Sequence, residues 1–204
     1  KMDCPSRNSL KKLARFFDAR QVGDVGPLGF RRSTNLTTLL ACAERLMAEN
    51  IIVPDRSAFL DLGCADGRVN LFFSYLARFS VGIELDEWTL DEYAPLKEEL
   101  EESLKDAGVG LPNENIYLFQ GDATDEAVHG QISHETSLSL ADFDFFYTYL
   151  IMHEEFAHML AEKAKKGAVY MVYGLHKIMP RYPGFRLMEE FSPMEGVLAL
   201  YEKE

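Results

Sequence analysis

The sequence is poor in cysteine, in basic residues and in long apolar segments. Its three cysteines, Cys4, Cys42 and Cys64, form neither a C-x-x-C pair nor an even disulfide framework. This usage is typical of a reducing, cytoplasmic setting. No run of about 18 apolar residues occurs, so we expect no membrane-spanning helix. The first residues also lack the apolar core of a signal peptide.

Basic residues are outnumbered by acidic ones. The chain has 21 lysines and arginines against 33 aspartates and glutamates, which gives a net charge of -12. A protein that binds a phosphate backbone needs a basic surface, so we expect no nucleic-acid partner. The charge suits a cationic partner, although solubility is the simpler explanation. The length of 204 residues predicts a single domain, 1–204.

The most informative stretch is residues 57–84. Residues 57–62 form a short apolar run, which predicts a buried strand. A turn of small residues follows at 63–67, and the apolar spacing over 68–79 predicts a helix. Residues 80–84 predict a second strand that ends in an acid, Glu84. The unit is therefore a strand, a glycine turn, a helix, a strand and an acid.

The chemistry of this unit points to a nucleotide-like ligand. Glycines let the backbone approach a ligand where a Cβ would clash, and the start of a helix offers free N–H groups. Glu84, at the end of the second strand, has the position of an acid that binds both ribose hydroxyls. Its offset from Asp61 is close to the roughly 20 residues expected for that role. We expect the ligand to lie outside the carboxyl ends of the strands.

The turn itself distinguishes between nucleotides. Its order, Asp61-x-Gly63-x-Ala65-x-Gly67, departs from the dinucleotide pattern G-x-G-x-x-G. It resembles motif I of the class I S-adenosylmethionine-dependent methyltransferases, with Ala65 in place of the middle glycine. The carboxylate of Asp61 suits a cationic ligand and would repel a pyrophosphate. NAD or FAD binding, and a glycine turn without a ligand, remain the alternatives.

The rest of the chain predicts an α/β architecture. Helices are predicted at residues 9–20 and, after N-cap candidates at 33–35, up to about residue 49, with a loop over 21–32. Residues 1–50 thus form a helical extension. The later elements are a helix at 88–107, strands at 115–120, 141–150 and 167–174, a short helix and a loop within 124–140, a helix at 152–166, and a hairpin of 185–191 with 196–201.

Alternation of strands and helices predicts a doubly wound, mostly parallel sheet over residues 57–204, closed by the antiparallel hairpin. This matches the seven-stranded, Rossmann-like sheet that the resemblance implies, preceded by the two N-terminal helices. The resemblance also implies the cofactor, S-adenosylmethionine, and contacts to it from Asp61, Gly63, Cys64, Ala65, Gly67, Glu84, Leu85, Asp122 and Ala123. In that family an acid at the position of Asp122 meets the adenine amino group; otherwise Asp122 caps the next helix.

A second resemblance concerns the methyl acceptor. Asp144 and Tyr147, which we place at the carboxyl end of the fourth strand, resemble the D-x-x-Y motif of some protein-lysine methyltransferases. The surrounding stretch, FDFFYTYLIMHEEF, is similar to broad-specificity archaeal lysine methyltransferases and their mitochondrial relatives. This implies that both side chains orient an amine. The simpler interpretation is a strand-end turn residue and an aromatic core residue.

Methyl transfer needs mainly in-line positioning, so we expect no metal. His153 and His158 imitate a zinc-protease motif, but they are five residues apart rather than four and diverge on a helix. We expect an amine acceptor, possibly a protein lysine, with Arg31, Arg32 and Asn35 as candidate rim residues. The alternatives are a small-molecule O- or N-methyltransferase, a non-catalytic S-adenosylmethionine-binding module and a nicotinamide-dependent oxidoreductase.

Overall fold

The computed structural model describes residues 1–26 and 29–204, and its centre is a seven-stranded sheet. The strands are β3 (Ala58–Asp61), β4 (Phe79–Glu84), β5 (Ile116–Gln120), β6 (Phe145–Tyr149), β7 (Val169–Tyr173), β8 (Phe185–Leu187) and β9 (Leu198–Lys203). Their order across the sheet is β5-β4-β3-β6-β7-β9-β8. The first five are parallel, and β9 is antiparallel to both β7 and β8. This confirms the predicted fold class.

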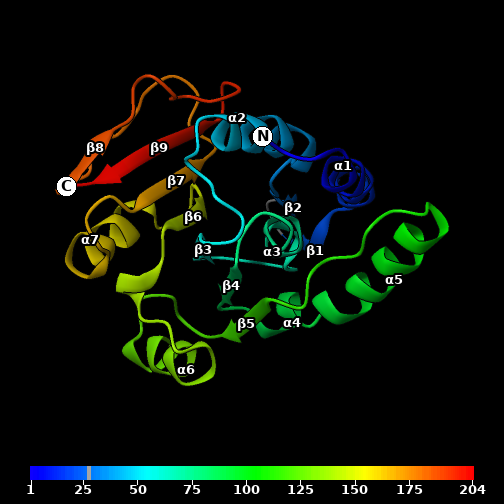
Figure 1. Ribbon diagram of the computed structural model, residues 1–204. Helices are drawn as coiled ribbons and strands as arrows, with labels where there is room; N and C mark the ends of the chain where they lie inside the picture. Colours follow the sequence, from blue (N-terminus) through cyan, green and yellow to red (C-terminus); the bar gives the residue numbers. More distant parts are fainter. Residues whose placement is uncertain (27–28) are drawn as a thin grey trace.

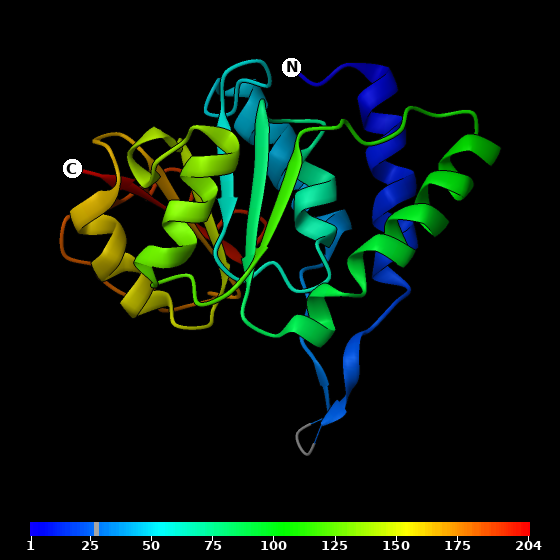
Figure 2. The same cartoon turned by 90° about the horizontal axis from the view of Figure 1, so that it is seen from below.

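Helices cover both faces of the sheet (Figures 1 and 2). They are α1 (Cys4–Asp18), α2 (Leu36–Ala48), α3 (Arg68–Phe73), α4 (Glu87–Leu90), α5 (Tyr93–Asp106), α6 (Glu126–Thr136) and α7 (His153–Lys163). Successive strand residues point to opposite faces. Phe59 and Phe145 therefore join the core under α1, α2, α3 and α5, while Leu60 and Phe146 join the core under α6 and α7.

Both N-terminal helices are confirmed, and side-chain caps fix their starts. Asp3 accepts a hydrogen bond from the Ser6 N–H at 2.7 Å, so α1 begins before the predicted residue 9. Asn35, one of the predicted caps, accepts from the Thr38 N–H at 2.8 Å and starts α2.

The loop predicted over residues 21–32 is wrong. The segment contains strands β1 (Val22–Gly26) and β2 (Gly29–Arg31), which pair antiparallel and project from the body of the molecule (Figure 2). The glycines in this segment favoured a loop. These glycines do not prevent the two ends of the segment from pairing with each other. Local composition alone does not show such a pairing.

The helix predicted over residues 68–79 ends at Phe73, where the chain tightens into a turn: the N–H groups of Tyr75 and Leu76 donate to the Phe72 and Phe73 carbonyls at 3.4 and 2.9 Å. Asn113 and Asn115, which precede β5, donate to the Ser74 carbonyl at 2.8 and 3.1 Å. The helix predicted over 88–107 is divided into α4 and α5. Pro95 lies in the first turn of α5, where a missing N–H is tolerated and where a continuous helix would lose a hydrogen bond.

Candidate active site

A pocket opens at the carboxyl ends of β3, β4, β5 and β6. Most of the predicted site residues meet in its wall, namely Asp61, Gly63, Cys64, Ala65, Glu84, Leu85, Asp122, Ala123 and Tyr147. Parallel strands bring their carboxyl ends to one edge of a sheet, which is why residues so distant in sequence converge. The other two predicted residues, Gly67 and Asp144, belong to the described part of the chain and lie outside this wall.

The turn after β3 has a backbone that favours glycine. Ala65 has φ 50° and Gly67 has φ 80°, both in the left-handed region. A Cβ at Gly67 would come within 2.5 Å of the Tyr93 ring. Gly67 is therefore required by packing against α5, which explains its place in the motif without a ligand contact. A Cβ at Gly63 would meet nothing within 4 Å, so this backbone is open to the pocket.

Two buried carboxylates face the pocket. Asp61 is 1% exposed and accepts from the Gly63 N–H at 3.1 Å. Glu84 is 2% exposed and accepts from the N–H groups of Ala65 at 2.8 Å and Asp86 at 3.0 Å. Burial raises the pKa of Asp61 to about 8. Asp61 is therefore largely neutral at pH 7, and a cation bound beside it would favour its ionised form, whereas a phosphate would not.

The pocket wall continues with the residues that follow β5. Asp122 is exposed, and its carboxylate accepts from the backbone N–H and the hydroxyl of Thr124 at 2.8 and 2.7 Å. These hydrogen bonds, the backbone one foremost, lower the pKa of Asp122. The alternative role of Asp122 as a helix cap is wrong, because Asp125 caps α6. The side chain of Leu85 is 65% exposed and that of Ala123 is buried.

The last part of the pocket wall combines β6 with residues from the N-terminal extension. Tyr147 is 2% exposed, and its hydroxyl forms a short hydrogen bond with the Thr34 hydroxyl. Burial raises the pKa of Tyr147 well above its usual range, so it is a neutral phenol. Ser33, Thr34 and Arg68 also line the pocket, and none of them was predicted as a site residue.

The candidate rim residues lie in the same region. Arg32 lines the pocket. Asn35 donates its backbone N–H to the Tyr173 hydroxyl at 3.2 Å. The Arg31 side chain lies outside the described part of the structure. These rim residues come near the pocket because their segment packs beside strands that are distant in sequence. No local sequence pattern shows this packing.

The predicted position of Asp144 is wrong. The strand β6 starts at Phe145, because residues 140–142 form a 3₁₀ turn that Ser139 caps. Asp144 therefore lies at the amino end of the strand, opposite the pocket. Its carboxylate accepts from the Ala58 N–H at 2.8 Å and pairs with Lys165 at 2.7 Å. These contacts hold the starts of β3 and β6 together.

The described residues offer neither a cluster of metal ligands nor a helix that could span a membrane. Within residues 1–26 and 29–204, no group of three or more His, Cys, Asp or Glu side chains is arranged to hold a metal ion. His153 instead shares a hydrogen bond of 2.6 Å with the Tyr182 hydroxyl. The helices of the described chain include none with the length and apolar character needed to span a membrane.

Comparison with known proteins places the fold. A scan against protein-family models and a search of curated proteins found no match. Among solved structures, an RNA methyltransferase from Salinibacter ruber in complex with S-adenosyl-L-homocysteine is similar, with a TM-score of 0.53 and 16% identity over 85% of this chain and 93% of that one. This chain has a methyltransferase fold.

A second solved structure supports this assignment. A putative methyltransferase from Escherichia coli has a TM-score of 0.53 and 18% identity over 90% of each chain. At such identities the likeness shows the fold and does not extend to the acceptor. In open α/β sheets, ligands bind outside the carboxyl ends of the strands, which is where the pocket described above lies.

The residues of this pocket fit S-adenosylmethionine. Glu84 lies at the end of the second strand of the sheet core, with the buried carboxylate that a ribose needs. Asp61 adds a second carboxylate beside the backbone of Gly63, where there is space for a ligand. The pocket thus offers carboxyl oxygens as acceptors for hydroxyl and amino groups, and a bound cation would favour the ionised form of Asp61.

Proposed function

We propose that the protein is an S-adenosylmethionine-dependent methyltransferase. The observation that carries this proposal is the pairing of two buried carboxylates, Asp61 and Glu84, with the open backbone of Gly63 at the carboxyl edge of a methyltransferase sheet. A protein that only packed its core would gain nothing from burying two acids side by side, since each burial costs free energy.

Each part of the pocket wall has a distinct task in this proposal. Glu84 binds the ribose hydroxyls, Asp61 faces the amino acid end with its positive charges, and Asp122 meets the adenine with Leu85 and Ala123 beside it. When bound, S-adenosylmethionine supplies a methyl group on a positively charged sulfur, which is a good leaving group. The task of the chain is then to orient the acceptor and to exclude water.

The acceptor that the pocket supports best is an amine, with a protein lysine ahead of a small molecule. A lysine must lose its proton before it attacks, and removal from water lowers its pKa from about 10.4. The exposed carboxylate of Asp122 attracts the charged form to the pocket, and the neutral hydroxyls of Thr34 and Tyr147 can orient the nitrogen. Asp144 gives this proposal no support, because it lies at the other end of β6.

Other acceptors are less well supported. RNA is named for the Salinibacter ruber neighbour, but the net charge of -12 and the acidic pocket both oppose a phosphate backbone. An oxygen or nitrogen nucleophile on a small molecule needs no such surface and is the main alternative. A module that binds the cofactor without transfer would keep the same cofactor walls.

Calorimetry with S-adenosylhomocysteine tests cofactor binding directly. We expect micromolar affinity in the wild-type protein and a loss of at least tenfold in Glu84→Ala, since two ribose hydroxyls lose a charged acceptor. Glu102→Ala is the matched control, because this glutamate is exposed on α5 away from the pocket. Absence of binding by the wild-type protein would refute the proposal.

Incubation with labelled S-adenosylmethionine identifies the acceptor class. A cell extract is treated and then separated into proteins, nucleic acids and small molecules. We expect label on protein lysines, reduced strongly by Tyr147→Phe and little by Asp144→Ala in folded protein. Label in RNA, or in a small metabolite with unlabelled protein, would exclude the lysine acceptor while leaving the methyltransferase proposal in place.

A further inference from the structure

Residues 32–35, which we term the strap, connect the β1–β2 hairpin to α2 and form part of the pocket wall. Three consecutive strap residues bond to three different elements of the core. The bonds join Ser33 to Arg68 on α3 (3.2 Å), Thr34 to Tyr147 on β6 (hydroxyl to hydroxyl) and Asn35 to Tyr173 on β7 (3.2 Å). The strap is therefore fixed in place residue by residue.

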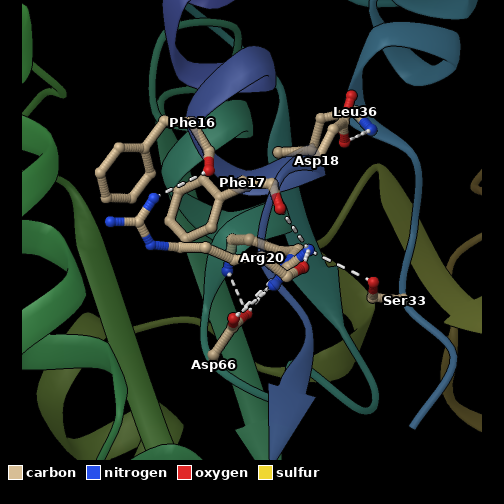
Figure 3. Close-up of polar contacts among 8 residues, drawn as sticks. Phe16, Phe17, Asp18, Arg20, Ser33, Leu36 and Asp66 are labelled. Carbon is tan, nitrogen blue, oxygen red and sulfur yellow. Dashed lines mark hydrogen bonds and ion pairs between the residues drawn. The ribbon is translucent and has the colours of Figure 1, made fainter. Parts of the chain in front are cut away.

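Arg68 anchors one end of the strap. Its side chain is 3% exposed and pairs with Asp66, which is fully buried, at 2.8 Å. The remaining guanidinium nitrogen donates to the Phe17 carbonyl at 3.1 Å and to the Ser33 hydroxyl. Figure 3 labels three of the partners of Arg68, namely Phe17, Ser33 and Asp66. With its donors engaged in this way, Arg68 serves to position the strap rather than to bind an anionic ligand, although it borders the pocket.

The Thr34–Tyr147 pair has unused hydrogen-bonding capacity. Two hydroxyls carry two protons and four lone pairs, and a bond between them uses one of each. Among the described residues, neither hydroxyl has another partner. Both side chains are buried and both line the pocket, at 5% and 2% exposure. Tyr147 is also opposite Asp61 in the β3–β6 register, so the pair lies beside the cofactor wall.

We propose that Thr34 is an acceptor-binding residue. Its hydroxyl oxygen, held by Tyr147 and kept in place by the Arg68 anchor, accepts a hydrogen bond from an N–H of the uncharged amine, which leaves the nitrogen lone pair free for the methyl group. This inference rests on the proposed methyltransferase function and assigns part of the specificity for the acceptor to the N-terminal extension. Two neutral hydroxyls suit an uncharged amine, whereas a carboxylate there would favour the unreactive ammonium form.

The first test compares three threonine variants. Thr34→Val removes the hydroxyl and keeps the shape, Thr34→Ser keeps the hydroxyl, and Thr37→Val is the control, since Thr37 is exposed and bonds Asp18 outside the pocket. We measure transfer of label from S-adenosylmethionine to cell-extract protein, together with the affinity for S-adenosylhomocysteine. Thr34→Val should lower the transfer rate tenfold or more and change the affinity by less than about twofold.

The conservative variant and the control complete this test. Thr34→Ser should transfer label within about threefold of the wild-type rate, and Thr37→Val at the wild-type rate. A wild-type transfer rate in Thr34→Val would overturn the inference. So would an equal loss of transfer and of S-adenosylhomocysteine affinity, because the strap would then act on the cofactor and not on the acceptor.

A second test does not depend on activity. In protein with labelled threonine methyl groups and bound S-adenosylhomocysteine, we add Nα-acetyl-lysine amide as an amine probe and follow the nuclear magnetic resonance signals. The Thr34 methyl signal should shift in proportion to probe occupancy while the Thr37 signal does not. An unmoved Thr34 signal would overturn the inference, whereas failure of the wild-type protein to bind S-adenosylhomocysteine would refute the proposed function itself.

Discussion

At the residue scale, the buried carboxyl of Asp61 makes stability depend on pH. Its pKa is raised to about 8 by burial in the folded protein, against about 3.9 in an unfolded chain. Between these two values the folded state holds more protons than the unfolded state, so stability decreases as pH rises from about 4 to about 8. Above about pH 8 both states are ionised and this contribution is constant.

Asp61→Asn removes this titration while keeping an acceptor for the Gly63 N–H. We expect the variant to gain stability relative to the wild-type protein as pH rises, on the order of 1 kcal/mol per pH unit within that window. Urea unfolding of both proteins at pH 5, 6 and 7 measures the difference, in which other groups cancel. A difference independent of pH would show that Asp61 is ionised in the folded state at all three values.

The sequence predicted the pocket residues around the glycine turn better than those from the N-terminal extension. Asp61, Gly63 and Glu84 belong to one continuous unit, so their spacing along the chain fixes their spacing in the fold. Thr34 meets Tyr147 only because α2 packs on the sheet, and no local pattern contains that contact. Asp144 was predicted at the wrong end of β6 because the apolar residues that precede this strand belong to a 3₁₀ turn.

At the element scale, the contact between α3 and β4 depends on a glycine that the motif does not include. A Cβ at Gly82 would lie 2.4 Å from the Asn70 Oδ1 and 2.7 Å from the Cys64 Cβ, both buried. Gly82→Ala should therefore destabilise the protein by about 1–3 kcal/mol through overpacking. Chemical denaturation measures this, and weaker S-adenosylhomocysteine binding should accompany it because Cys64 lies in the turn.

Gly130→Ala is the matched control for this substitution. Gly130 is exposed within α6, and a Cβ there meets nothing within 4 Å. Alanine should stabilise the helix by roughly 0.5–1 kcal/mol, because it is less flexible in the unfolded chain. If both substitutions changed the free energy of unfolding equally, close packing at Gly82 would not be the cause.

The boundaries of helices and strands also depend on contacts between distant residues, which a local sequence pattern does not show. The strand and helix types were predicted correctly over the core because their apolar periods are strong. The end of α3 was not, since the turn that follows it is held from another part of the chain, where Asn113 and Asn115 donate to the Ser74 carbonyl. The β1–β2 hairpin was missed for a related reason: its strands are defined by each other and not by their own composition.

At the scale of the whole molecule, the N-terminal extension shares a core with one face of the sheet. Leu13 and Phe17 of α1 are fully buried in the cluster that also contains Phe59 of β3. The anchor at Arg68 adds a polar connection from α3 to the end of α1. We predict that residues 1–204 unfold as one cooperative unit, with a single transition observed by every probe.

Arg68→Met tests how far this unit depends on one buried charge pair. The variant leaves Asp66, fully buried, without its cation, and breaking such a pair costs about 3–5 kcal/mol. Hydrogen exchange should then accelerate in α1 together with β3. The double variant Asp66→Asn, Arg68→Met removes both charges and should recover most of the loss, because no unpaired charge remains. Faster exchange in α1 with unchanged exchange in β3 would show instead that the extension opens independently of the sheet.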